Sequence, residues 1–125
     1  MKNGQHSNFT VINRQANSLF SLIADRQYRA TSLGRNMWKT LIGSQASLQT
    51  HCNKEGFNAA CSSVGYAKAR IGIVGNNEDN CRTCDSRIGF GTTGYHDDSN
   101  TCGNVADGGD NGNKYIKTMG YILIQ

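Results

Sequence analysis

The stretch from Ala69 to Asn104 constrains the fold of this 125-residue chain most, because three of its five cysteines lie there. Two β-like runs, Ala69–Val74 and Ser86–Phe90, flank a polar turn that holds two of these cysteines. A loop rich in glycine and aspartate follows and holds the third; in chain order they are Cys81, Cys84 and Cys102. No residue set in this stretch spells out a reaction. The sequence therefore indicates a class of fold before it indicates an activity.

The composition predicts a single domain that spans residues 1–125. The chain is long enough to bury a core, and its apolar and aromatic residues occur in short clusters throughout, unlike those of a disordered chain. Fifteen glycines and no proline favour tight turns and closely packed loops over long helices. We expect an α+β fold: a disulfide-stabilised, twisted, mostly antiparallel sheet with one or two short helices and long loops.

Apolar patterning predicts the strands. The run from residue 68 alternates cleanly, and the last nine residues end in continuous apolar side chains, as a central strand would. Ser18–Ala24 fits either a buried strand or a helical turn, and Gln27–Ala30 fits a further short strand. The predicted strands are Asn8–Asn13, Lys68–Val74, Ser86–Gly91 and Lys117–Gln125.

One helix is predicted after Thr31, because apolar residues recur there on one helical face. These residues are Met37, Trp38, Leu41 and Ile42. Ser32 or Asn36 is a suitable N-cap, and Gly43 is a natural end. Residues 44–50 are polar and form a connector.

The cysteines favour disulfides in an oxidising compartment. A bridge between Cys52 and Cys61 would close a small polar loop, and Cys81 or Cys84 could bond to Cys102. The odd number means that one thiol is free, pairs outside the chain, or has lost its partner through truncation. The connectivity stays open at this level.

A zinc site is the alternative. Cys81, Cys84, His96 and Cys102 follow the spacing C-x2-C-x11-H-x5-C, and thiolates with an imidazole suit a tetrahedral ion. This interpretation would make the chain an intracellular zinc module, and it leaves two cysteines unexplained.

Residues 97–113 are rich in oxygen ligands and glycine. Asp and Asn side chains on a loop able to wrap are what Ca²⁺ requires, although the spacing is not that of an EF-hand. The same residues also form ordinary turns, so both interpretations stay open.

Several function classes are disfavoured. The net charge of +4 is scattered rather than concentrated, which argues against nucleic-acid binding. Gly89–Gly94 matches G-x-G-x-x-G, but no helical pattern follows it to bind a dinucleotide. Motifs of nucleophilic catalysis are absent, so we expect no enzyme. No apolar run is long enough to span a bilayer, and Met1–Ser7 does not resemble a signal peptide, so a secreted form would be a mature or excised piece.

Longer phrases together resemble one family. They are NRQANSLFSLIADRQYRATSLGRNMWKTLIGS, HCNKEGFNA, KARIGIVGNNEDNCRTCDSRIGFGTTG, DDSNTCGN and IKTMGYILIQ. They look like the globular domain of the secreted, fibrinogen-like proteins of corals and other animals described as uncharacterized skeletal organic matrix proteins. The resemblance runs from about Asn13 to Gln125. Cys81, Cys84 and Cys102 match the family pattern, whereas Cys61 departs from it.

This resemblance implies a secreted, disulfide-bonded domain with a fibrinogen C-terminal-like fold, of which the chain would be the C-terminal portion. In a secreted protein, the triplet Asn8-Phe9-Thr10 would be a site for N-glycosylation. By analogy with fibrinogen-related domains, Ca²⁺ would bind at Asp97, Asp98, Asn100, Asp107 and Asp110. A neighbouring lectin-like surface of Tyr95, His96 and Tyr115 would bind glycans or extracellular matrix proteins. The alternative within the matrix is a structural component without a discrete ligand, and the oligomeric state stays open.

Overall fold

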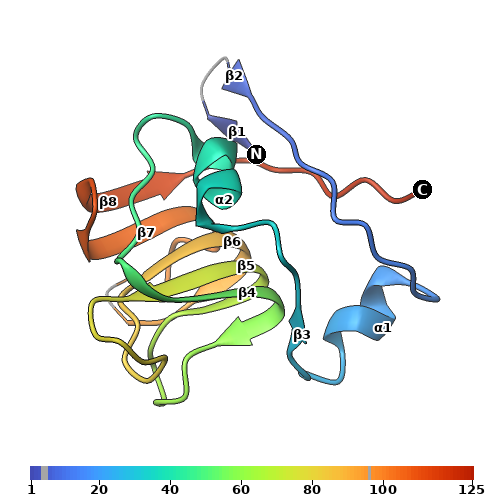
Figure 1. The fold of residues 1–125 in the computed structure, drawn as a ribbon. Coiled ribbons are helices and arrows are strands. Elements are labelled where there is room, and N and C mark those ends of the chain that lie inside the picture. Colours follow the sequence, from blue (N-terminus) through green and yellow to red (C-terminus); the bar gives the residue numbers. More distant parts are fainter. Residues whose placement is uncertain (4–5, 96) are drawn as a thin grey trace.

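The computed structural model describes residues 1–3, 6–95 and 97–125. This part of the chain is organised around a six-stranded sheet in which all neighbouring strands are antiparallel (Figure 1). The strands lie across the sheet in chain order: β3 (Arg29–Ala30), β4 (His51–Ala60), β5 (Lys68–Asn76), β6 (Ser86–Thr93), β7 (Cys102–Gly109) and β8 (Gly112–Lys117). The remaining elements are the strand pair β1 (Lys2–Asn3) and β2 (His6–Ser7) and the helices α1 (Leu19–Ile23) and α2 (Arg35–Ile42). The expected antiparallel sheet with short helices is confirmed.

The main apolar core lies between α2 and one face of the sheet. Phe57 on β4 pairs with Ile71 on β5, and Ile73 pairs with Ile88 on β6, so their side chains share this face. Helix α2 contributes the buried side chains Trp38, Leu41 and Ile42 to the same cluster. Trp38, at 1% exposed, is the largest of these buried side chains.

The helix predicted after Thr31 is confirmed, with corrections at its start. Its N-cap residue is Gly34, and no side chain of its own segment caps it, so Ser32 and Asn36 do not have the predicted role. Met37 is 40% exposed rather than buried with its neighbours. The helix ends at Gly43, as predicted.

A side chain from β4 replaces the missing cap. The buried carboxylate of Glu55 accepts hydrogen bonds from the backbone N–H groups of Leu33 (3.0 Å) and Gly34 (2.7 Å). It also accepts from the Trp38 indole N–H (2.9 Å) and the Thr31 hydroxyl (2.5 Å). The carboxylate thus satisfies backbone donors ahead of the helix and places negative charge at its N-terminus, where the helix dipole favours it.

Four glycines form one row across the sheet. Register places them opposite one another on β4, β5, β6 and β7, in the order Gly56, Gly72, Gly89 and Gly103. A Cβ atom on Gly72 would lie 2.2 Å from the carbonyl oxygen of Ile88. The strands therefore approach here more closely than residues with side chains would allow. Glycines expected in turns also lie inside strands.

Two disulfides lie in the described part of the chain, and they join β4 and the residue that follows it to the turn between β5 and β6. Cys52 bonds to Cys81 and Cys61 bonds to Cys84, while Cys102 is a free thiol. Both predicted pairings, Cys52 with Cys61 and the bond to Cys102, are therefore wrong. The antiparallel pairing of β4, β5 and β6 places the β5–β6 turn, with Cys81 and Cys84, beside β4. Cys102 lies instead at the start of β7, where its sulfur contacts Thr118.

The polar segment 53–60, predicted as a loop, is part of β4. It is strongly bent, with positive φ angles at Cys52, Asn53 and Asn58. This bending explains how the sulfur atoms of Cys52 and Cys61 come within 4.8 Å of each other and of Cys84. The sequence did not predict this strand, because its side chains show no apolar alternation. Its backbone pairing with both neighbours, β3 and β5, defines it.

Both predicted terminal strands are wrong. Residues 8–16 form an extended segment outside the sheet, with Phe9 87% exposed. At the other end, β8 begins earlier than predicted and ends at Lys117, so the apolar tail 118–125 does not form a central strand. The physical reason is the register: Gly103 on β7 pairs with Lys117, and β7 begins only one residue before Gly103, so the tail has no more of β7 beside it. Leu123 is 89% exposed.

Candidate functional site

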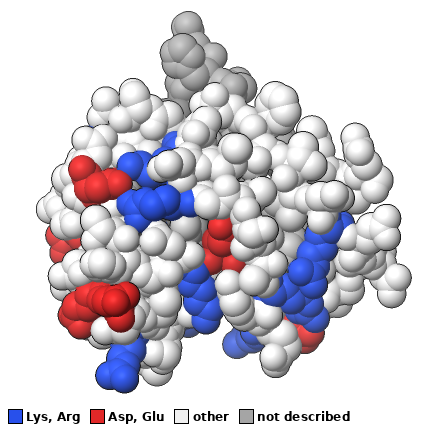
Figure 2. Space-filling view, in the orientation of Figure 1, with Lys and Arg blue, Asp and Glu red and all other residues white. Residues whose placement is uncertain are grey.

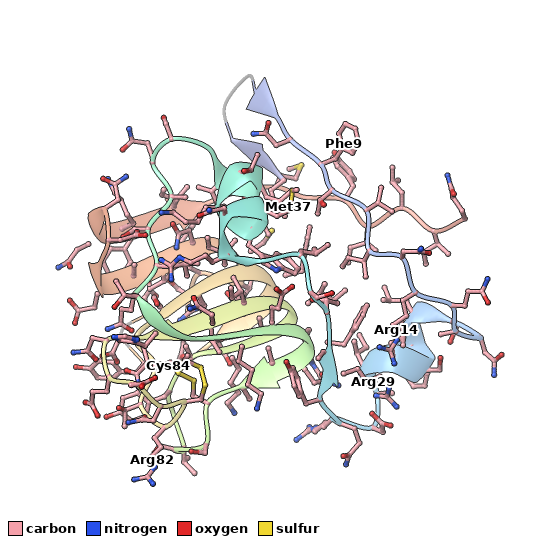
Figure 3. The ribbon with its side chains drawn as sticks, viewed as in Figure 1. Phe9, Arg14, Arg29, Met37, Arg82 and Cys84 are labelled. Atoms are coloured by element: carbon pink, nitrogen blue, oxygen red, sulfur yellow. A yellow bond between two sulfur atoms is a disulfide. The ribbon has the colours of Figure 1, made fainter. Side chains whose placement is uncertain are left out.

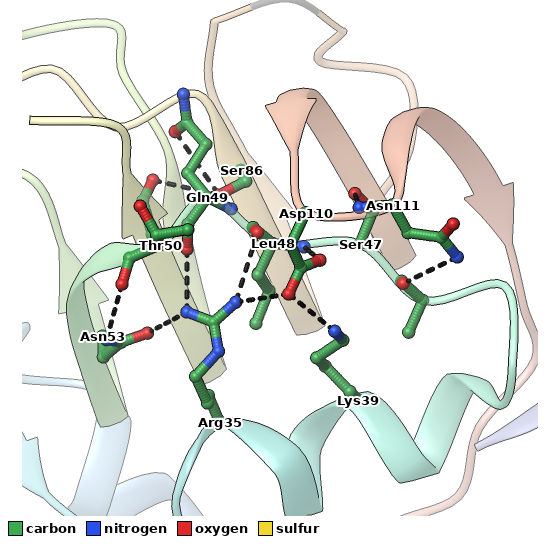
Figure 4. A network of polar contacts seen from close by, with 12 residues as sticks. Arg35, Lys39, Ser47, Leu48, Gln49, Thr50, Asn53, Ser86, Asp110 and Asn111 are labelled. Atoms are coloured by element: carbon green, nitrogen blue, oxygen red, sulfur yellow. Dashed lines mark hydrogen bonds and ion pairs between the residues drawn. The ribbon is translucent and has the colours of Figure 1, made fainter.

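Asp110, one of the predicted calcium ligands, is held by two cations (Figure 4). Its carboxylate lies 2.7 Å from both Arg35 Nη2 and Lys39 Nζ of α2. The other carboxylate oxygen accepts from the backbone N–H of Leu48 (3.1 Å), and Arg35 also donates to the carbonyl of Gln49 (2.9 Å). Desolvation raises the pKa of Asp110, but these hydrogen bonds and the charge of Lys39 lower it overall. The contacts assign Asp110 to the joint between α2 and the β7–β8 turn.

The described residues of the loop between β6 and β7, 94–95 and 97–101, lie on the sheet face opposite α2. Arg87 on β6 points to this face and is only 1% exposed. Its guanidinium donates hydrogen bonds to the carbonyls of Gly94 (3.2 Å), Asn100 (3.1 Å) and Asp97. Burial lowers the pKa of Arg87, while the charges of Asp98 and Asp97 raise it. The loop therefore wraps around a buried cation that belongs to the protein.

The remaining predicted calcium ligands have different surroundings: two accept hydrogen bonds within the loop itself, one is buried, and one lies elsewhere. Asp97 accepts from the Ser99 backbone (2.8 Å), and Asp98 accepts from the Gly94 backbone (2.6 Å). Asn100 is buried, and its side-chain nitrogen donates to the Ile116 carbonyl (3.0 Å), whereas its side-chain oxygen has no hydrogen-bond partner among the described residues. The fourth ligand, Asp107, lies near the far end of β7, and Asp110 lies in the turn beyond that end.

The structure thus places the five predicted ligands in two groups with one residue between them: Asp97, Asp98 and Asn100 precede β7, Asp110 follows it, and Asp107 lies on the strand. Strand β7 separates Asp97, Asp98 and Asn100 from Asp110, and a strand of eight residues spans roughly 25 Å. Ca²⁺ binds its ligands at about 2.3–2.6 Å, so one ion cannot bind both groups. Calcium binding by one of the groups stays a prediction.

Two of the three residues predicted to bind a ligand lie within electrostatic range of each other. Tyr115 on β8 has the Tyr95 phenol and the carboxylates of Asp97 and Asp107 near enough to raise its pKa, after the larger effect of desolvation. Tyr95 is 51% exposed and Tyr115 is 49% exposed. His96, the third, lies outside the described residues.

A third tyrosine extends this group. Tyr66, in the turn between β4 and β5, has its ring centroid 5.4 Å from that of Tyr95. The sequence analysis did not select Tyr66. The only available signal was its position between two segments that contain cysteines, residues 52–61 and 81–84. We call Tyr66, Tyr95 and Tyr115, with Asp97 and Asp107, the tyrosine surface. It combines the half-exposed rings of Tyr95 and Tyr115 with carboxylates, which suits binding rather than bond breaking.

The predicted zinc ligands are not available as a set. Cys81 and Cys84 are in disulfides, so neither is a thiolate. Among the described His, Cys, Asp and Glu side chains, one group lies close enough to hold a metal ion, and its members, Cys52, Cys61 and Cys84, are all disulfide-bonded. Figure 3 shows the disulfide sulfurs next to Cys84, with Arg82 pointing away from the protein.

The predicted glycosylation residue, Asn8, lies in the extended segment between β2 and α1. Basic and acidic side chains are interspersed on the face of the molecule shown in Figure 2, in agreement with a charge spread along the sequence. Among the described residues, no helix has both the length and the apolar character needed to cross a membrane.

The chain was compared with models of protein families, with curated proteins and with solved structures, and no match was found in any of the three.

Proposed function

We propose that this chain is an extracellular, non-catalytic recognition module that binds a glycan or a matrix protein through the tyrosine surface. One observation carries the proposal: the rings of Tyr66 and Tyr95, from two separate segments, lie 5.4 Å apart. Tyr115 on β8 lies within electrostatic range of Tyr95 and of the carboxylates of Asp97 and Asp107. Tyrosine gives large contact area at little cost in conformational entropy, and its hydroxyl adds a hydrogen bond. Such residues are typical of binding surfaces.

The extracellular part of the proposal has separate support. Two disulfides in a chain of this size are typical of an oxidising compartment. The resemblance to fibrinogen-like skeletal matrix proteins points the same way, and we extend it to the fold as a proposal. An experimental structure would test that extension by comparison with a fibrinogen C-terminal domain.

A glycan array, followed by a binding screen against purified matrix proteins, tests the recognition function. We expect a hit whose affinity falls at least about tenfold in the variants Tyr95→Ala and Tyr115→Ala. Tyr121→Ala is the matched control, because Tyr121 is 71% exposed but lies in the C-terminal tail. Absence of any hit, or equal losses in all three variants, would contradict the proposal and favour a structural component without a discrete ligand.

Calcium binding has its own test. Isothermal titration of the oxidised protein with Ca²⁺ distinguishes a site in the β6–β7 loop from no site, and Asp97→Asn is the informative variant. Heat that is lost in this variant would support a calcium site in the loop. Heat that persists in Asp97→Asn but disappears in Asp107→Asn would place the site at the other end of β7.

A further inference from the structure

We infer that Arg87 acts as an internal cation that orders the described part of the β6–β7 loop, residues 94–95 and 97–101, in place of a metal ion. Its importance for recognition depends on the function proposed above, because this loop carries Tyr95 and Asp97. The ordering of the loop does not depend on that function. Arg87 is thus a positioning residue for the tyrosine surface.

The first argument is the direction of the carbonyl groups. Loops that bind Ca²⁺ aim several backbone carbonyl oxygens at the ion. In this loop the carbonyls of Gly94, Asp97 and Asn100 accept hydrogen bonds from the two terminal nitrogens of one guanidinium. A guanidinium has five N–H donors in a fixed plane, so it can hold several carbonyls that a lysine ammonium would reach less completely.

The second argument is charge and burial. Arg87 is 1% exposed, and a buried cation requires compensation. The carboxylates of Asp97 and Asp98 act on it from the same loop. A second cation at this position would have to approach Arg87, which electrostatic repulsion in a buried site opposes.

The third argument is the connection to the tyrosine surface. Register places Arg87 on β6 opposite Val105 on β7, and Val105 opposite Tyr115 on β8. Arg87 and Tyr115 are therefore two strands apart on one face, roughly 10 Å. The loop above is closed by Thr92, whose hydroxyl donates to the Asn100 carbonyl (2.7 Å). Arg87 thus holds the loop that carries Tyr95 and lies on the same sheet face as Tyr115.

Hydrogen exchange of the oxidised protein tests this inference without any ligand. The readout is exchange at the loop amides of Gly94 and Tyr95, which donate to Asp98 and to the Gly65 carbonyl, compared with the amides of β5. The first arm compares the wild-type protein in EDTA with the same protein in millimolar CaCl₂. We expect the loop amides to exchange at rates equal within twofold.

The second arm compares variants. Arg87→Lys keeps the charge but loses the planar fork, and Arg87→Met loses both. Arg82→Met is the matched control, because Arg82 is exposed and points away from the protein. We expect loop exchange to increase at least tenfold in Arg87→Lys, and more in Arg87→Met, while β5 exchange in Arg87→Lys changes less than twofold. The control should match the wild type.

Several results would overturn the inference. Faster loop exchange of the wild type in EDTA would show that a metal ion orders the loop. Unchanged loop exchange in Arg87→Lys would show that the guanidinium is dispensable, and equal acceleration in the loop and β5 would show a general loss of stability. Because none of these readouts uses a ligand, a failed ligand screen would end the proposed function and leave this test standing.

Discussion

At the scale of single residues, buried polar side chains hold the parts of the chain that lie outside the sheet. Glu55 binds the segment before α2, and Arg87 binds the β6–β7 loop. Asn104 on β7 holds the connector, because its amide exchanges hydrogen bonds with the backbone of Ser47 (2.8 and 2.9 Å). Each of these three residues is less than one-tenth exposed. Loss of any one leaves backbone groups unpaired in the interior.

The substitution Glu55→Gln should destabilise the protein by about 2 kcal/mol, because a carboxamide nitrogen would face N–H donors that now bond to a carboxylate. Urea unfolding at pH 7 measures the change. Glu78→Gln is the control, since Glu78 is exposed, and it should stay within about 0.5 kcal/mol of the wild type. Equal stability of both variants would contradict the capping role.

The same carboxylate predicts a pH dependence. Desolvation raises the pKa of Glu55, but hydrogen bonds from Thr31, Trp38 and the loop backbone lower it below its ordinary 4.5. A lowered pKa means that the stabilisation is present above pH 4.5 and is lost as the pH falls through the folded-state value. The acid-dependent loss of stability should therefore be smaller in Glu55→Gln than in the wild type.

At the scale of elements, close strand approach depends on the glycine row. Gly72 has no strained φ angle, so a side chain at this position would be destabilising only because it would overlap neighbouring atoms. The positions on either side, Ile71 and Ile73, point into the core below. The row therefore leaves the backbone of β5 little room to move away from an added atom.

The substitution Gly72→Ala should cost about 3 kcal/mol or more, or prevent folding, since the new Cβ would overlap a backbone carbonyl. Gly34→Ala separates this effect from conformational strain, because Gly34 has φ of +88° but open space around it. We expect a cost of about 1 kcal/mol for that variant. Thermal and urea unfolding of both variants provide the comparison, and a larger loss for Gly34→Ala would contradict the steric argument.

The C-terminal tail gives a second prediction at this scale. Removal of residues 122–125 should change the free energy of unfolding by less than about 0.5 kcal/mol, because Ile122, Leu123 and Ile124 are exposed outside the sheet. Urea unfolding of the truncated chain measures this. A loss of several kcal/mol would mean that the tail is the buried central strand suggested by its apolar sequence.

At the scale of the whole molecule, the disulfides tie the long strand β4 to the β5–β6 turn at two points. The sequence separations are 29 residues for Cys52–Cys81 and 23 residues for Cys61–Cys84. Cross-links that close loops of this size typically stabilise a domain by about 2–4 kcal/mol each. The disulfides lie on the sheet face opposite α2, and Val74 packs in the same cluster.

A non-reducing mass map should recover peptides that link residue 52 to 81 and 61 to 84, with Cys102 as the alkylated thiol. Replacing Cys52 and Cys81 together by alanine should lower stability by about 3 kcal/mol. Cys102→Ala is the control, and its stability should stay near that of the wild type. A linked peptide containing Cys102, or five reduced thiols in the folded protein, would contradict this arrangement.

The sequence by itself determined the features that depend on neighbouring residues. Apolar alternation identified β5 and β6, helical spacing identified α2, and Gly43 marked its end. At the candidate site it also named Tyr95 and Tyr115, which lie within electrostatic range of each other. These signals are local, because side-chain period and backbone preference act within a few residues.

Only the tertiary structure decided the features that depend on partners far along the chain. Strand β4 is defined by its neighbours, the cysteine pairs by the register of three strands, and the exposed tail by the point where β7 begins. The same holds for Asp110, whose cations come from a helix about 70 residues earlier. A carboxylate looks alike in sequence whether it binds a metal ion or an arginine, because the choice rests on what folding places beside it.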